Sequence, residues 1–300
     1  MDLSEDKSIK GIILTALLLA SSLSGAAEQT LEAVFVEQMP MIDGTATETS
    51  WQSARSIQTF DPISNTTIEI RALYNDDCIA ILVEFDDADE TRSHKPLVWD
   101  NFTRFYRVGA QREDAMVFKW NMDPFADDIS LQASKPYKAD IWYWKAHRGD
   151  HSGFADDKYQ VYSKFKFSRK NKLLANGDGN TFYFSRHGDA GRSTYSSLSP
   201  TEYIEDNLSG YQLQQPSGSR ADVRARGQWK NNRWTIEFLR NLDTGNIDDV
   251  KFDVNRRLLF GVSRYEIAAR KPDPTIIPPE YGSGEVNDKL YLVFRPGAVK

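Results

Sequence analysis

The sequence predicts an all-β protein, an antiparallel β-sandwich that carries a long irregular insertion. Short segments of alternating apolar residues recur along the chain, and Gly, Pro, Asn and Asp separate them. Helical periodicity is limited to one or two turns around residues 47–54. The length left after an N-terminal leader, about 270 residues, fits one large β domain.

Each predicted strand combines β-branched and aromatic residues between turn signals. The clearest hairpin turns at Asn231 and Asn232, because asparagine tolerates the positive φ that a tight two-residue turn requires. The predicted strands are residues 67–74, 78–85, 115–120, 141–146, 223–230, 233–240, 258–264 and 290–294.

The segment from about residue 158 to residue 218 differs in composition from the rest. It mixes charges and is rich in Ser, Gly, Gln and Pro over residues 193–199 and 212–219. Such a composition cannot bury a core of its own. We therefore expect a loop-rich excursion on a single domain that spans residues 28–300.

The N-terminus has the pattern of a secretory signal peptide over residues 1–27. Lys7 and Lys10 precede an apolar run at 11–20, and small residues follow it. That run is about half the roughly 20 residues that cross a bilayer, and no later segment is comparably apolar. We expect a periplasmic or secreted protein with no membrane span in the mature chain.

Charge and cysteine content exclude several classes. The formal net charge of −6 makes nucleic acid an unsuitable partner for an exported chain. Cys78 is the only cysteine, so neither an intrachain disulfide nor a Cys-x-x-Cys-His haem attachment can form. Its apolar neighbours favour a buried strand thiol.

The most informative segment is the strand that contains Trp142 and Trp144. In a strand these two indoles share one face, while Tyr143 and Lys145 share the other. A paired indole face of this size either fills a core or forms the floor of a flat apolar pocket, which suits a planar macrocycle. The sequence leaves both interpretations open.

Five segments carry a resemblance to known proteins. Residues 42–54 resemble the opening of a domain shared by family 9 carbohydrate-binding modules and by the haem-binding domain of the ethylbenzene dehydrogenase and dimethylsulfide dehydrogenase gamma-subunit type. Residues 140–146 and 153–157 are similar to the Asp-x-Trp-x-Trp-Lys-Ala signature of the haem-binding branch. Residues 95–99 and 227–240 match further segments of that branch, whereas residues 158–218 match poorly.

The resemblance implies a periplasmic module that holds haem b and carries electrons, often beside molybdenum and iron–sulfur subunits. It implies one methionine and one lysine as axial ligands, which we place at Met116 and Lys230, with Trp142, Trp144 and Lys145 lining the cofactor. A thioether suits ferrous iron, and burial helps a lysine to lose its proton. The alternatives are Met122 for Met116, Lys119 or Lys145 for Lys230, and His147 directly after the signature.

Structural interpretations of the same residues stay open. Met116 alternates with Phe118 and Trp120, a spacing that is common in core packing. Lys230 stands beside a turn, where an exposed lysine is the default, and the four histidines lie in polar segments typical of solvated loops.

Acidic clusters are candidates for a structural calcium site, although none has EF-hand spacing. They are residues 86–90, Asp127–Asp128, Asp156–Asp157 and Asp248–Asp249.

We find no catalytic constellation and expect a binding protein rather than an enzyme. The alternative to the haem module is a carbohydrate-binding module of the family 9 type, in which exposed tryptophans stack on sugars.

Overall fold

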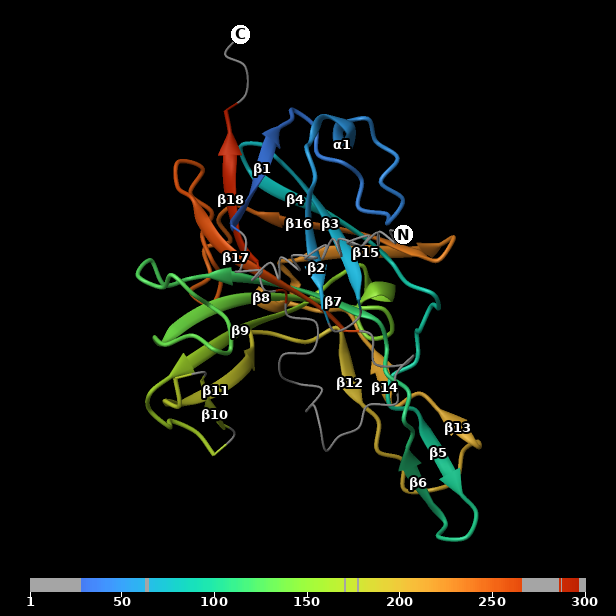
Figure 1. Ribbon diagram of the computed structural model, residues 1–300. Coiled ribbons are helices and arrows are strands. Elements are labelled where there is room, and N and C mark those ends of the chain that lie inside the picture. Colours follow the sequence, from blue (N-terminus) through green and yellow to red (C-terminus); the bar gives the residue numbers. More distant parts are fainter. Residues whose placement is uncertain are drawn as a thin grey trace, which may run out of the picture.

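The structure is a computed structural model that describes residues 28–62, 65–169, 171–176, 178–265, 286 and 288–296. The predicted signal peptide at 1–27 lies outside these residues. Figure 1 shows a β-rich body from which a small three-stranded arm projects.

One thirteen-stranded sheet makes up most of the described chain. Its strands, in spatial order, are β10 (Lys172–Ala175), β11 (Thr181–Gly188), β9 (Asp156–Ser163), β8 (Tyr137–Lys145), β7 (Ala115–Asn121), β17 (Leu258–Tyr265), β18 (Lys289–Arg295), β1 (Glu28–Phe35), β3 (Thr66–Tyr74), β4 (Cys78–Asp86), β16 (Arg233–Asn241) and β15 (Arg224–Lys230), with β2 (Ile57–Asp61) beside β3.

Smaller elements surround this sheet. β12 (Tyr195–Ser197) pairs with β14 (Tyr211–Leu213), and the projecting arm joins β5 (Leu97–Asp100) to β6 (Phe105–Val108) and β13 (Asn207–Leu208). The described helices are short, and they are α1 (Ser50–Ser53), η1 (Asp150–Ser152) and η2 (Gly218–Ala221). The all-β prediction is therefore confirmed.

The sheet is mixed rather than purely antiparallel. β1 runs parallel to both of its neighbours, β18 and β3, whereas the other pairs of described strands are antiparallel. A parallel pair needs a crossover of a dozen or more residues, and the chain between β1 and β3 supplies it with α1 and β2. Alternation along single strands could not reveal this order.

The sheet closes over itself, so that its two halves pack face to face. Side chains of β7 and β8 share one core cluster with those of β4, β15 and β16. Phe118 of β7 meets Phe238 of β16 edge to face, with ring centroids 5.3 Å apart. Trp144 of β8 meets Trp234 of β16 in the same way at 4.9 Å. These contacts form the main core of a β-sandwich.

Two expectations from the sequence are corrected. The segment from residue 158 is not a loop throughout, because β9, β10 and β11 extend the main sheet. Tyr162 and Phe182 of these strands stack at 4.4 Å in a second core cluster, so alternating aromatics give this part a buried face. Cys78 is half-buried rather than buried, because it begins β4 at the edge of a turn.

The hairpin turn between β15 and β16 is confirmed. Asn231 and Asn232 have φ values of 53° and 60°, in the left-handed region that this turn requires. Three residues before the end of β15, Gly227 lies against the Trp144 ring, and a Cβ at Gly227 would overlap the indole. A larger residue at position 227 would therefore push the hairpin away from β8.

We predict that Trp142→Ala lowers the free energy of unfolding by about 3–5 kcal/mol, because it leaves a cavity between the two halves of the sandwich. Trp142 is fully buried. Phe102→Ala is the matched control, since Phe102 is 96% exposed and its loss leaves no cavity. Urea unfolding of both variants measures the difference, and equal losses would contradict the core position of Trp142.

Candidate functional site

The two indoles of the signature strand belong to the core. Trp142 and Trp144 are completely buried on the inner face of β8. The Trp142 ring lies 6.3 Å from Phe238, and the Trp144 ring packs against Trp234 and Gly227. The opposite half of the sandwich therefore covers the surface that a flat cofactor or a sugar would need at these residues.

Met116 and Lys230 lie on different faces. Met116 is fully buried on the inner face of β7, paired with Trp144 of β8. Lys230 is exposed at the end of β15, where Trp229 points inward and the lysine points outward. The structure does not bring these two predicted ligands together.

Lys145 lies on the outer face of β8, where its side chain forms an ion pair and a hydrogen bond. Its buried ammonium pairs with Asp156 and donates to the Tyr195 hydroxyl at 3.2 Å. Lys158 at 2.9 Å and Arg220 pair with the same carboxylate. Lys145 thus ties β8 to β9 and to the excursion rather than facing the indoles.

Burial controls the ionisation of this network. Burial lowers the pKa of Lys145 to about 8, although the Asp156 carboxylate opposes the shift. Burial alone would raise the pKa of Asp156, but the charges of Lys145, Lys158 and Arg220 outweigh it and hold that pKa far below its usual value. Asp156 therefore stays ionised across the physiological range.

His147 follows β8 in a different polar setting. Its backbone N–H donates to Glu113 Oε2 at 2.8 Å, and its ring Nε2 lies 3.1 Å from Ser209 Oγ. Burial lowers its pKa, so the imidazole is neutral near pH 7. Met122 lies at the other end of the β7–β8 pair, where its N–H donates to Lys138. These two alternative ligands therefore do not meet.

Met122 lines a cleft of about 420 Å³ between the end of β7 and the segment that leads into β17. Lys251, Arg256 and Arg257 bring positive charge to this cleft, and Tyr291 of β18 brings an aromatic ring. The volume falls within the range of small-molecule sites. Among the methionines predicted as ligands, Met122 is the one that faces this described cleft.

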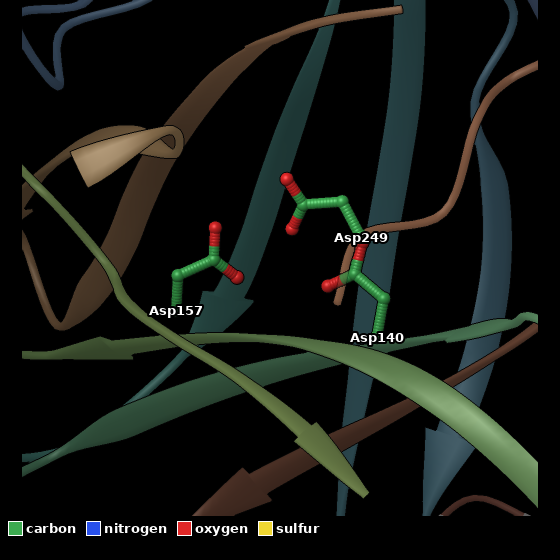
Figure 2. A group of neighbouring side chains, drawn as sticks. All are labelled: Asp140, Asp157 and Asp249. Carbon is green, nitrogen blue, oxygen red and sulfur yellow. The ribbon is translucent and has the colours of Figure 1, made fainter. Parts of the chain in front are cut away.

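Three buried carboxylates gather beside the inner face of β8 (Figure 2). Asp140 comes from β8, Asp157 from the start of β9, and Asp249 from the segment before β17. One oxygen from each lies within 4.8 Å of the others. Asp189, which follows β11, is also buried and interacts electrostatically with Asp140 and Asp249.

Positive charge near this carboxylate cluster (Asp140, Asp157, Asp249 and Asp189) is limited. Arg240 is fully buried and pairs with Asp140, and its Nη1 lies 3.7 Å from Asp249. In the described part of the chain, Asp140 Oδ1 and Asp157 Oδ2 have no hydrogen-bond partner. With every carboxyl group ionised, the cluster would therefore hold more negative charge than its neighbours compensate.

The pKa values reflect this imbalance. Burial, followed by repulsion between the carboxylates, raises the pKa of Asp189 to about 8 and raises that of Asp157 well above its usual value. Burial also raises the pKa of Asp140 to about 6, despite Arg240. The pKa values of these carboxyl groups are higher in the folded state than in the unfolded state. Ionisation of the groups therefore destabilises the folded protein increasingly as the pH rises above their unfolded pKa values.

Sequence reasoning found only part of this cluster. It included Asp157 and Asp249 in two acidic pairs, but it missed Asp189, and it treated Asp140 only as the first residue of the signature. The other acidic pairs have different roles, since Asp87 pairs with Arg264 and Asp127 with Lys135. Alternation does show that Asp140 shares the face of Trp142, and a carboxylate on a buried indole face was the available signal.

Comparison with known proteins gives a family match. The model of the family described as ethylbenzene dehydrogenase matches residues 43–269. None of the curated proteins compared with the chain matches it significantly. Within the part of the chain that the structure describes, no helix combines the length and the apolar composition needed to cross a bilayer.

Solved structures with a similar fold include a family 9 carbohydrate-binding module from Caldicellulosiruptor kristjanssonii. Its complex with cellotriose is 12% identical in sequence, with a TM-score of 0.40, and the match covers 91% of this chain and 98% of that chain. Its complex with glucose is 11% identical, with a TM-score of 0.39 and the same coverage.

We predict that Asp156→Asn lowers the free energy of unfolding by about 3–5 kcal/mol at pH 7, because it leaves Lys145 buried beside other cations without a carboxylate. Lys145→Met should cost less, since Lys158 and Arg220 still neutralise Asp156. Urea unfolding at several pH values provides the measurement.

The difference in the free energy of unfolding between the wild type and Asp156→Asn should depend on pH. The folded-state pKa of Asp156 is depressed, so its stabilising contribution is present above the unfolded value of 3.8 and is lost as the pH falls below it. The gap between the wild type and Asp156→Asn should therefore narrow in acid. A gap that widens in acid would contradict this account.

Proposed function

Since the chain belongs to the ethylbenzene dehydrogenase family, we propose that it is a haem b-binding electron-transfer module that serves as a subunit or partner of a molybdenum oxidoreductase. The family match supports the association with such an enzyme. The cleft beside Met122 is the structural observation that supports a cofactor in this chain. Bound haem would supply a one-electron carrier whose potential depends on its ligands and burial.

The residues of the cleft suit such a group. Met122 offers a thioether, a soft ligand for iron. Arg256 offers a guanidinium group, which suits a carboxylate such as a propionate, whereas the Arg257 guanidinium pairs with Glu28 and lies over the Tyr291 ring. Leu258 and Leu259 supply apolar surface for a ring. We therefore place the proposed ligand at Met122 in preference to Met116.

Lys251 also lines the cleft, but its role there is to supply charge. Its ammonium pairs with Asp243 at 2.6 Å, and this hydrogen bond raises the pKa of Lys251. A lysine that binds iron must lose its proton. Lys251 therefore complements an anionic group rather than acting as a ligand.

Non-covalent binding and export are parts of the same proposal. A single cysteine cannot form the two thioether bonds of a Cys-x-x-Cys-His attachment, so haem in this chain is of the b type. The leader at 1–27 supports a periplasmic or secreted location. Catalysis would belong to the partner, because we find no nucleophile and base arranged for chemistry in the described residues.

The carbohydrate alternative has weaker support at the residues that suggested it. Sugar stacking requires exposed aromatic faces, whereas Trp142 and Trp144 are fully buried. A sugar site in this chain would have to use other aromatics.

We predict that the protein, produced with ample haem supply, shows a Soret band that shifts on reduction. Met122→Leu should change the reduced-minus-oxidised spectrum, because it replaces the thioether with a side chain of similar size. Met116→Leu is the matched control, since it makes the same change inside the core. Its spectrum should match that of the wild type.

Each other outcome has a definite meaning. A change in Met116→Leu alone would move the ligand to Met116. A colourless protein that stays colourless after hemin is added would refute haem binding altogether. Tryptophan fluorescence changes on titration with oligosaccharide would then favour the carbohydrate module.

A further inference from the structure

We propose that Asp140, Asp157 and Asp249 form a binding site for a divalent cation of the size of calcium. They meet from three separate parts of the chain, and Figure 2 shows their carboxylates turned toward a common space. The site takes a different class of ligand from the proposed haem, and its carboxylates are not among the groups proposed to hold haem, although Asp249 also lines the cleft beside Met122.

The spacing of the oxygens suits one ion. Calcium binds oxygen at 2.3–2.6 Å, so two oxygens on opposite sides of it are about 4.6–5.2 Å apart. The candidate oxygens of Asp140, Asp157 and Asp249 all lie within 4.8 Å of one another. A single calcium-sized ion can therefore contact all three carboxylates without rearrangement of the backbone.

Unpartnered oxygens give a second and independent indication. Asp140 and Asp157 have no exposed surface, and within the described residues Asp140 Oδ1 and Asp157 Oδ2 accept no hydrogen bond. The other oxygen of Asp140 accepts from Arg240 and from the Val250 N–H at 3.0 Å. The partnered oxygens hold these side chains in place, so that the unpartnered ones face the shared space.

The balance of charge favours a divalent ion. Arg240 contributes one positive charge beside three carboxyl groups, and a fourth, Asp189, lies close by. Buried carboxylates without compensation are strongly unfavourable. A cation with two charges offsets this repulsion, as a second arginine would.

The donor set selects the class of metal. All the groups are carboxylates, with no nitrogen or sulfur donor in the described cluster. Oxygen-only sites suit hard cations such as calcium and magnesium, whereas zinc and copper favour imidazole or thiolate. Magnesium demands near-ideal octahedral contacts at about 2.1 Å and gives up its waters reluctantly, whereas calcium accepts flexible coordination, so we expect calcium to bind more tightly.

The test is thermal unfolding of the full chain after treatment with EDTA, followed by titration with CaCl2 or MgCl2. At a free calcium concentration one hundred times the dissociation constant, we expect Tm to rise by roughly 5 °C or more, with a smaller rise for magnesium. No rise with either ion, together with no metal detected in the purified protein by elemental analysis, would overturn the proposal.

Asp157→Asn locates the site. We expect this variant to lose the calcium-induced rise in Tm while unfolding no earlier than the wild type in EDTA, because it replaces a buried carboxyl group that has an unpartnered oxygen among the described residues of the metal-free protein. The control is Asp127→Asn, which removes an exposed carboxylate paired with Lys135 and should keep the full calcium response. A calcium response that persists in Asp157→Asn would place the ion elsewhere and refute this site.

A spectroscopic measurement covers the case in which Asp157→Asn does not fold. Terbium replaces calcium at oxygen sites, and Trp142 pairs with Asp157 across β8 and β9. Excitation of tryptophan in the wild type should therefore produce terbium emission that calcium displaces. Absence of displaceable emission would count against the site whatever the fate of the variant.

Discussion

The ion pair between Asp140 and Arg240 connects the core to the carboxylate cluster and, through Val250, to the wall of the cleft beside Met122. Alternation along β8 puts Asp140 on the same inner face as Trp142, so folding has to bury a carboxylate among indoles. Arg240 of β16 compensates it, and its guanidinium also stacks 5.1 Å from the Trp142 ring and donates to the Val250 carbonyl. One cation thus joins the two halves of the sandwich and fixes the segment that contains Asp249.

The strands and their faces could be read from the sequence, but their partners across the sandwich could not. Alternation placed Trp142 and Trp144 on one face, and the Asn231–Asn232 turn was correct in position and in φ. Whether the indoles form a core or a pocket depends on what lies opposite them. The opposing residues, Phe238 and Trp234, come from a strand about ninety residues later, and no local pattern encodes that pairing.

The positions of the candidate ligands also depend on tertiary structure that no local pattern encodes. Met116 and Lys230 fall on strands whose relative orientation is set by the closure of the sheet, so their separation onto different faces is a tertiary property. The carboxylate cluster is tertiary too, because Asp140, Asp157 and Asp249 are separated along the chain. What the sequence did contain was the signature itself, in which an aspartate precedes two indoles and a lysine. Its charged residues proved to be ion-paired on opposite faces of β8, with Arg240 and with Asp156.

The cleft and the carboxylate cluster share a wall, and this has a thermodynamic consequence. Asp249 belongs to the cluster and also lines the cleft beside Met122, and Val250 next to it is held by Asp140. An ion that binds Asp249 restricts the motion of the segment that forms one side of the cleft. A cofactor that then binds in the cleft causes a smaller loss of conformational entropy in that segment. Coupling between two sites is reciprocal, so a cofactor in the cleft would strengthen cation binding by the same factor. The two proposals are chemically independent, yet the fold makes their binding equilibria depend on one segment.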